Sequence, residues 1–413
     1  MRKRVVITGL GCISPLGNSV DEAWQALMAG KTGAGPITHF DASQHKTKFA
    51  CEVKDFEPAA LFGGREARRM DRFTQFALAA ARQALDNSAL AVDDSNRDRI
   101  GVVVGSGIGG IGTLAEQVAV LAEKGPDRVS PFLVPMMISD TAAGMTAIHL
   151  GLRGPNMAVV TACASGNNAI GEATEMIRRG AADVMLAGGA EAAITPITIA
   201  GMNVMGALST RNDDPLTASR PFDKTRDGFV MGEGGVMLVI ESLEHARARG
   251  ATILAEITGY GTTDDAYHVS APAENGSGAA KCMQIAIADA GLNVTDIDYI
   301  NAHGTSTPLN DKSETAAIKT VFGEQAYKVA VSSTKSMTGH MIGAAGAMEA
   351  LICTLTFKHN ILPSTINYAN PDPDCDLDII PNKPRRANPR HVMSNSFGFG
   401  GHNATLVFSR FEE

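Results

Sequence analysis

The sequence predicts an α/β protein in which buried strands alternate with amphipathic helices. Short runs rich in β-branched residues, such as 99–105 and 236–240, are separated by longer stretches in which apolar residues have helical spacing. Apolar residues make up 44% of the 413 residues, which excludes a disordered chain and allows a large core. Glycine is unusually common, with 43 residues, and glycine serves where a backbone turns sharply or approaches another group closely.

The predicted strands are distributed along the whole chain. In chain order they are residues 4–8, 99–105, 157–162, 183–188, 236–240, 253–261, 298–303, 328–333 and 404–408. Helices are expected between them, most plainly at residues 21–30, 72–88 and 167–180. A seam at residues 246–252 separates a helix from the next strand, and strands and loops follow in a similar order on either side. We therefore expect two halves, residues 1–250 and 251–413, although their sequence identity is negligible.

Charge and cysteine content restrict the partners and the compartment. The chain has 36 basic and 44 acidic residues, a net charge of −8, which argues against non-specific nucleic-acid binding. Its six cysteines have no metal-binding spacing and indicate a reducing compartment without a zinc site or disulfide framework. The apolar N-terminal run is too short for a signal peptide, and no stretch has the pattern of a membrane span. We expect a soluble cytoplasmic protein.

Cys163 stands at a predicted strand-to-helix turn. It follows the apolar run 157–162 in the segment TACASG, and helical spacing starts directly after it. Unpaired N–H groups and the helix dipole at such a position favour a thiolate. A sharp turn of this kind exposes the nucleophilic serine of other α/β enzymes. An isolated cysteine is more often a buried structural residue, but this setting predicts a nucleophile, and the other five cysteines lack it.

A histidine ends a predicted strand in the second half of the chain. His303 is followed by a glycine and a turn rich in hydroxyl groups, at the kind of strand end where α/β proteins expose ligand sites. Thr305 and Thr307 in this turn are able to donate hydrogen bonds to a substrate that carries amides. Asp311 and Glu314 fit a helix capping box better than an acid–base pair, so we interpret both as structural.

A second histidine and a lysine follow the predicted strand 328–333. His340 and Lys335 lie in the loop SSTKSMTGH, and the helix after it is apolar apart from Glu349. Because a buried carboxylate without a partner is costly, we expect Glu349 to pair with Lys335. The alternative is a lysine that is simply solvated, and the sequence supports the two interpretations about equally.

Two glycine-rich loops also follow or precede strands. The segment GSGIGG at 105–110 has the spacing of a dinucleotide-binding loop, but no second strand ending in an acidic residue follows it, so that interpretation is weak. The segment SFGFGG at 396–401 is able to present a backbone N–H to a developing oxyanion. Taken alone, a loop of this composition is more often an ordinary turn.

Four segments together resemble the elongating β-ketoacyl-acyl-carrier-protein synthases of dissociated fatty-acid synthesis, and the type II enzymes most of all. They are GPNMAVVTACASG, NAHGTSTPLND, SSTKSMTGHMIGAAG and NSFGFGGHN, in this order along the chain. The resemblance covers nearly the whole sequence. It implies a thiolase-like fold of two duplicated α/β halves in αβαβα layers, a homodimer, and chemistry that needs no metal, nucleotide or flavin cofactor.

The resemblance also implies roles for individual residues. Cys163 matches the acyl-accepting nucleophile, and His303 and His340 match the paired histidines. Lys335 matches the active-site lysine. Phe399 matches the gate residue whose backbone N–H shares an oxyanion hole with that of Cys163. Thr305 and Thr307 match the threonines that contact the pantetheine arm of the carrier, and Ile108 lies where the acyl pocket is gated.

Binding of an acidic acyl carrier protein to a chain of net charge −8 requires a local basic patch. The run 63–72 is rich in arginine, and two further arginines are expected to extend it. The candidate docking residues are Arg65, Arg68, Arg69, Arg72, Arg128 and Arg211. An ordinary solvated helix face is the alternative interpretation of this run.

We therefore expect an acyltransferase that moves an acyl chain from acyl carrier protein to Cys163. It then decarboxylates malonyl-carrier and joins the two by Claisen condensation to give a 3-oxoacyl-carrier. A biosynthetic thiolase is the second candidate, but it would carry another cysteine where this chain has NSFGFGG. A chain-length factor would lack the nucleophile, and a dehydrogenase would need a complete dinucleotide motif. The sequence leaves the preferred acyl length open.

Overall fold

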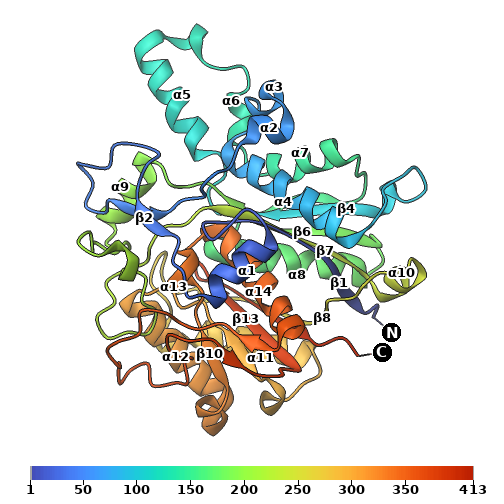
Figure 1. Cartoon of the computed structure of the whole chain (residues 1–413), viewed down its shortest axis with the longest axis vertical. Helices are drawn as coiled ribbons and strands as arrows, with labels where there is room; N and C mark the ends of the chain where they lie inside the picture. Colours follow the sequence, from blue (N-terminus) through green and yellow to red (C-terminus); the bar gives the residue numbers. More distant parts are fainter. Residues whose placement is uncertain (1, 413) are drawn as a thin grey trace.

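Ten strands form one sheet in the computed structural model, which describes residues 2–412 (Figure 1). The strands of the first half are β1 (Val5–Ile13), β4 (Ile100–Gly105), β5 (Asn156–Val159), β6 (Val184–Glu191) and β7 (Gly234–Ser242). Those of the second half are β8 (Ala255–Asp264), β9 (Tyr299–Asn301), β10 (Ala330–Ser332), β13 (His391–Phe397) and β14 (His402–Ser409). Two small antiparallel pairs lie outside this sheet: β2 (Ala34–Pro36) with β3 (Phe49–Cys51), and β11 (Ile361–Leu362) with β12 (Arg385–Arg386).

The two halves of the sheet have the same topology. The spatial order is β10-β9-β13-β14-β8-β1-β7-β6-β4-β5. From the centre outward, the first half therefore has β1, β7, β6, β4, β5 and the second half has β8, β14, β13, β9, β10. When the five strands of each half are numbered along the chain, both halves have the same order: first, fifth, fourth, second, third. Each half also has two antiparallel pairings next to its first strand and two parallel pairings toward its edge. The halves join where residues 5–7 of β1 pair with residues 255–257 of β8. The predicted duplicated α/β fold is confirmed.

Helices cover both faces of each half-sheet and produce five layers (Figure 1). α4 (Arg72–Ser88) and α7 (Thr141–Leu150) pack on the outer face of the first half, and α11 (Ser277–Asp289) and α12 (Pro308–Phe322) on that of the second. α8 (Ser165–Arg178) and α14 (Ala345–His359) lie between the two halves. Residues 345–357 of α14 are all buried, which explains why that helix is apolar on every side.

The remaining helices are short or peripheral. They are α1 (Val20–Met28), α2 (Pro58–Phe62), α3 (Gly64–Ala67), α5 (Ile111–Lys124), α6 (Leu133–Met137), α9 (Pro196–Val204), α10 (Leu243–Ala248) and α13 (Lys335–Thr338). α5 and α6 project from the body of the molecule at the top of Figure 1. Within residues 2–412, no helix combines the length and the apolar character needed to cross a membrane.

The largest differences from the sequence prediction within the main sheet are at β1 and β13. β1 continues past the predicted 4–8 to Ile13 through Gly9 and Gly11, where a Cβ would lie only 2.2 Å from Ala84 O and 1.9 Å from Ala80 O of α4. These glycines therefore belong to a strand against which a helix packs closely, rather than to a turn. β13 was not predicted, because its residues 394–396 are polar although they are fully buried.

Candidate active site

A cavity of about 530 Å³ holds the side chains that the sequence singled out. Its wall combines the strand-to-helix turn of the first half with the loops that follow β9, α13 and β13 in the second half. One end is apolar and the other is polar. The lining residues from the sequence prediction are Ile108, Cys163, His303, Thr305, Thr307, His340 and Phe399. Residues nearly three hundred positions apart in the sequence thus meet in one site.

Cys163 lies on a strained turn directly before α8. Ala162 has a φ of 49°, in the left-handed region that side chains other than glycine rarely adopt. The turn is held by Ser165, whose hydroxyl accepts from Thr161 N at 2.9 Å and donates to Ala162 O at 2.7 Å. The predicted sharp strand-to-helix turn is therefore present, and it brings the Cys163 side chain to the cavity.

Burial opposes the thiolate that the helix N-terminus favours at Cys163. Burial raises the pKa of the thiol to about 12. The positive charge of Lys335 and the backbone N–H groups of Phe399 and Cys163 act in the opposite direction, but they are outweighed. Because Cys163 is only 6% exposed, water stabilises its thiolate poorly, and this loss of hydration free energy exceeds the stabilisation that the helix N-terminus provides. The Cys163 side chain is therefore expected to carry its proton at neutral pH.

His303 and His340 face each other beside the thiol. The centroids of the two rings are 5.3 Å apart and the ring planes are nearly perpendicular, at 83°. The Cys163 sulfur and one ring nitrogen of each histidine all lie within 4.8 Å of one another. Burial, and after it the charge of Lys335, places the pKa of both rings well below 6.5. Both are neutral at pH 7, so each has one N–H to donate.

The capping-box interpretation of Asp311 and Glu314 is wrong. The N-cap of α12 is Thr307, whose side chain accepts from Asn310 N. The Glu314 carboxylate reaches the loop after β9 instead, where it accepts from the backbone N–H of His303 at 2.8 Å and of the next residue at 2.7 Å. Burial raises the pKa of Glu314 to about 7. This residue therefore fixes the backbone on which the first histidine stands.

The expected contact between Lys335 and Glu349 is present. The Lys335 ammonium bonds the Glu349 carboxylate, and both side chains are 2% exposed. Burial raises the pKa of Glu349 to about 7, although the lysine acts to lower it. A solvated lysine is excluded by this burial. Because the pair lies beside the cavity, the lysine charge lowers the pKa of Cys163, His303 and His340 alike.

The loop of residues 398–401 between β13 and β14 packs against the turn that carries Cys163. A Cβ on Gly398 would lie 3.0 Å from Cys163 N and 2.7 Å from Thr161 O. The backbone N–H groups of Phe399 and Cys163 are directed toward the Cys163 sulfur closely enough to lower the pKa of the thiol. A carbonyl carbon attached to that sulfur would have its oxygen near the same two donors, which is the arrangement of an oxyanion hole.

We expect Gly398→Ala to slow acylation of Cys163 by about 10²-fold, because the new methyl group displaces the loop from the nucleophile turn. The rate of acyl-adduct formation on the Cys163 peptide measures this. Gly144→Ala is the control, since a Cβ there meets no atom within 4 Å. Equal acylation rates in the two variants would contradict the proposed closeness of the loop and the turn.

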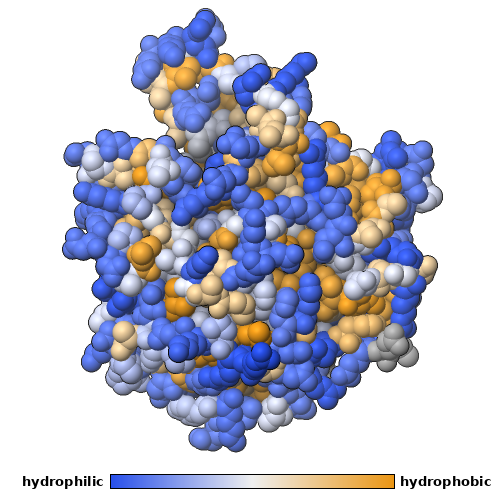
Figure 2. Space-filling view, in the orientation of Figure 1, coloured by the Kyte–Doolittle hydropathy of each residue, from blue (hydrophilic) through white to orange (hydrophobic). Residues whose placement is uncertain are grey.

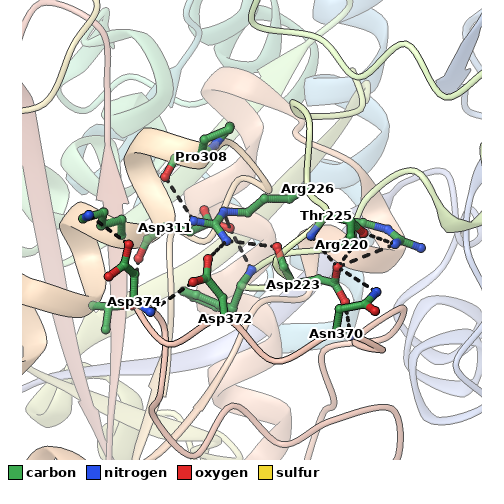
Figure 3. Close-up of polar contacts among 12 residues, drawn as sticks. Arg220, Asp223, Thr225, Arg226, Pro308, Asp311, Asn370, Asp372 and Asp374 are labelled. Atoms are coloured by element: carbon green, nitrogen blue, oxygen red, sulfur yellow. Dashed lines mark hydrogen bonds and ion pairs between the residues drawn. The ribbon is translucent and has the colours of Figure 1, made fainter.

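A buried arginine holds the loop that carries Thr305 and Thr307 (Figure 3). Arg226, with 5% of its side chain exposed, donates to Thr307 O at 3.2 Å and to Pro308 O at 3.1 Å, and it pairs with Asp372 at 2.5 Å. The hydroxyls of the two threonines are 2.9 Å apart. Their position at the polar end of the cavity is therefore set by a guanidinium on a distant part of the chain.

Two aspartates complete this network. Asp311 accepts from Phe222 N at 2.8 Å and from Ser306 N at 3.2 Å. Asp223 accepts from the backbone N–H groups of Ala369 at 2.8 Å and of the following asparagine at 2.6 Å. Neither Arg226 nor Asp223 is predictable from the sequence, because an arginine or an aspartate in a loop is usually solvated and only the folded chain surrounds these two.

The predicted docking arginines have different environments. Arg65, Arg68 and Arg128 are exposed, whereas Arg69 and Arg211 are half-buried. The Arg69 guanidinium lies 5.1 Å from the centroid of the Phe132 ring, which places α3 beside the segment that follows Arg128. Arg72 does not belong to this set: it bonds the buried Glu233 at 2.8 and 3.0 Å, so the sequence interpretation of this one residue is wrong.

Comparison with known proteins was made on the whole chain. The family description "Beta-ketoacyl synthase, N-terminal domain" matches residues 2–246, and "Beta-ketoacyl synthase, C-terminal domain" matches residues 254–369. The 3-oxoacyl-[acyl-carrier-protein] synthase 2 of Synechocystis sp. is 53% identical over 411 residues, which covers 100% of this chain and 99% of that protein. The protein of the same name from Staphylococcus aureus is 54% identical over 410 residues and covers 99% of both.

Solved structures give the same result. The ishigamide ketosynthase/chain length factor has a TM-score of 0.94 and 40% identity, and the alignment covers 100% of both chains. A type II PKS ketosynthase that is bound to the hexaketide and in complex with its acyl-carrier protein has a TM-score of 0.92 and 35% identity, again over 100% of both chains. Both identities are high enough for the similarity to extend beyond the fold.

Proposed function

This chain belongs to the β-ketoacyl synthase family and is a condensing enzyme of fatty-acid elongation, and on that premise we propose which residues perform its chemistry. Cys163 accepts the acyl chain, and His303 and His340 stabilise the enolate formed from malonyl-carrier. One observation carries the proposal: the sulfur of a thiol and a ring nitrogen of each of two neutral imidazoles lie within 4.8 Å of one another at the wall of one cavity. Burial, a buried lysine and two backbone N–H groups complete the arrangement.

Acylation begins when an acyl thioester enters the cavity. The Cys163 sulfur loses its proton and attacks the carbonyl carbon, and the N–H groups of Cys163 and Phe399 hold the negative oxygen of the tetrahedral intermediate. The bond to the pantetheine sulfur then breaks, and that sulfur leaves as a thiol with the proton. Exchange of one thioester for another costs little free energy, so most of the barrier lies in the oxyanion. Loss of one oxyanion donor costs roughly 10²–10³ in rate.

Decarboxylation follows when malonyl-carrier occupies the polar end of the cavity. The bond to the terminal carboxylate breaks, carbon dioxide leaves, and the electron pair moves onto the thioester as an enolate. His303 and His340 each donate one N–H to the enolate oxygen. Because their pKa values are lowered well below 6.5, both rings are neutral donors. The carbanion attacks the acyl carbonyl, the bond to the Cys163 sulfur breaks, and the sulfur takes up a proton from water to restore the thiol. The 3-oxoacyl-carrier then leaves.

The direct test is a mass measurement. Incubation with acyl-carrier should add the mass of one acyl group to the peptide that contains Cys163, and addition of malonyl-carrier should then remove it. An acyl group found on another residue, or none at all, would overturn the assigned role of Cys163.

Thr305 and Thr307 are proposed to bind the pantetheine arm, and Ile108 to line the acyl end of the pocket.

We propose that acyl carrier protein docks on the arginines around α3. Arg68→Glu should raise the KM for acyl-carrier roughly fivefold, with kcat nearly unchanged, because an exposed charge contributes modestly to association. Titration in low and high salt should show the difference shrinking as salt rises. Arg386→Glu, also at an exposed arginine, is the control. A KM indifferent to both Arg68→Glu and salt would contradict this docking surface.

We propose a homodimer that forms through the edge of the sheet at β5. Within residues 2–412 this strand pairs only with β4. Its Met157 is 40% exposed, and Val160, directly after the strand, is 54% exposed. An unpaired apolar edge strand is a site of association. Figure 2 shows further apolar patches around the base of α5 and beside α2 and α7. A second copy placed against β5 would cover the strand edge and extend the sheet.

Met157→Arg should therefore shift the protein from a dimer to a monomer of 43.2 kDa in light scattering after size exclusion. The charge would lie at the centre of the proposed contact, where it would be desolvated without a partner. Ile285→Arg, which changes an exposed isoleucine on the outer helix α11, should remain dimeric. An unchanged dimer in the Met157 variant would exclude this edge as the interface.

Two further proposals concern organisation and location. We place the boundary between the halves at residues 250 and 251, which lie in the connection between α10 and β8. We also infer a cytoplasmic location, and the six cysteines support it because all of them are free thiols and buried.

A further inference from the structure

Glu191, the last residue of β6, is a buried carboxylate that the mechanism does not use. None of its surface is exposed, and burial raises its pKa to about 7. Each group that hydrogen-bonds it is neutral: three backbone N–H groups and one hydroxyl. Burying a carboxylate without a cationic partner costs free energy. The four donors that compensate this cost therefore indicate a role for Glu191.

The four donors come from both halves of the chain. Gly107 N at 2.7 Å and Gly343 N at 3.0 Å bond one carboxylate oxygen. Ile108 N at 3.2 Å and the Ser106 hydroxyl at 3.1 Å bond the other. Residues 106–108 follow β4 of the first half, and Gly343 lies in the turn before α14 of the second half. One carboxylate thus ties together two segments that no strand pairing connects.

Both segments form the apolar end of the cavity. Ile108 and Ile342 line it, and both pack in the apolar cluster that contains Cys163. The polar end is formed by the threonine turn and the loop after β8. An acyl chain attached to Cys163 must therefore extend toward Ile108 and Ile342, where apolar surface is buried.

The two segments are in direct contact. A Cβ on Gly343 would lie 2.4 Å from Gly107 N, and a Cβ on Gly107 would lie 2.7 Å from Ile342 Cγ2. Ile342 also has a φ of 43°, which is an outlier for a β-branched residue. Strain of this kind persists only where neighbouring groups hold it, and the bond from Gly343 N to Glu191 follows directly after the strained residue.

We propose that Glu191 is a positioning residue that determines which acyl chain lengths the enzyme accepts. Its carboxylate holds together the two segments that carry Ile108 and Ile342 and so keeps the apolar wall that these side chains form in place. A short acyl chain ends before this wall, whereas a long chain has to displace it. The inference rests on the proposed function, because it requires an acyl chain on Cys163.

Glu191→Gln is the appropriate test. Glutamine keeps the size of the side chain, but its NH₂ group faces backbone N–H donors, so two of the four bonds are lost. With the wall loosened, acylation by a long-chain acyl-carrier should rise relative to a short-chain one. The ratio of kcat/KM for lauroyl-carrier to that for butyryl-carrier should increase about fivefold, and the value for butyryl-carrier should stay within about twofold.

Glu241→Gln is the matched control, since this buried glutamate lies in β7 and bonds Arg249 away from the cavity. Its ratio should equal that of the wild type. If Glu191→Gln does not fold, Ser106→Ala removes one donor to the same carboxylate and should raise the ratio in the same direction. An unchanged or lowered ratio overturns the proposal. Wild-type protein that forms no adduct on Cys163 would overturn the proposed function instead.

Discussion

Cys163→Ala should abolish formation of the acyl adduct and lower condensation by about 10⁴-fold or more, while malonyl decarboxylation should continue. Removal of a nucleophile removes the covalent intermediate altogether, and the remaining rate comes only from binding and oxyanion stabilisation. Decarboxylation should not need the thiol, because the proposed donors to the enolate oxygen are His303 and His340. The loss of one step and the survival of the other separate this variant from one that has merely unfolded.

The measurement combines two assays on one sample. Mass spectrometry of the protein after incubation with acyl-carrier reports the adduct, and release of carbon dioxide from malonyl-carrier reports decarboxylation. Cys282→Ala is the control, because that thiol is also buried but bonds Gly261 O, outside the cavity. Condensation that persists in the Cys163 variant at more than about a hundredth of the wild-type rate would show that the nucleophile lies elsewhere.

Replacement of both histidines has the second large effect. In the Cys163→Ala background, adding His303→Ala and His340→Ala should lower decarboxylation by about 10²–10³-fold or more, because each removes a donor to the enolate oxygen. The two rings are 5.3 Å apart and act on one atom, so the double variant should cost less than the product of the single effects. His391→Ala, at the start of β13 and outside the cavity lining, is the control.

The pH dependence of decarboxylation follows from the same burial. Because the pKa of both rings lies well below the ordinary 6.5, protonation requires a lower pH than for a solvated histidine. Decarboxylation should therefore keep its neutral donors as the pH falls from 7.5 to about 6. A loss of half the rate near pH 6.5 with the pattern of a single proton would contradict the neutral-donor role.

Much of the site is encoded in short segments. The turn at Cys163 is predicted by small residues between an apolar strand and an amphipathic helix, and the structure has that turn with Ala162 in the left-handed region. The partner of Glu349 is also predictable, because a carboxylate in an apolar helix needs a cation and Lys335 stands one loop away. Local pattern and the cost of burying a charge suffice for both.

Other properties depend on contacts across the fold. Burial raises the Cys163 pKa to about 12, against the local helix effect that the sequence shows. Glu314 bonds the loop of His303 rather than its own helix, and Arg226 holds Thr307 from 81 positions away. These pKa values and hydrogen bonds depend on which groups are buried and which loops come into contact when the two halves pack together. The sequence pattern of a single segment does not contain that information.

Composition, the strand and helix pattern and the four motifs were thus sufficient for the α/β class and the duplicated fold, because each depends on neighbours in the sequence. The same motifs supply the reacting residues that we propose. Only the tertiary structure decided three other properties. They are the protonation states of the buried groups, the ion pair that separates Arg72 from the docking arginines, and the hydrogen bonds of Glu191 to both halves of the chain. Desolvation and long-range hydrogen bonding determine these properties, and both arise only when distant segments enclose a side chain together.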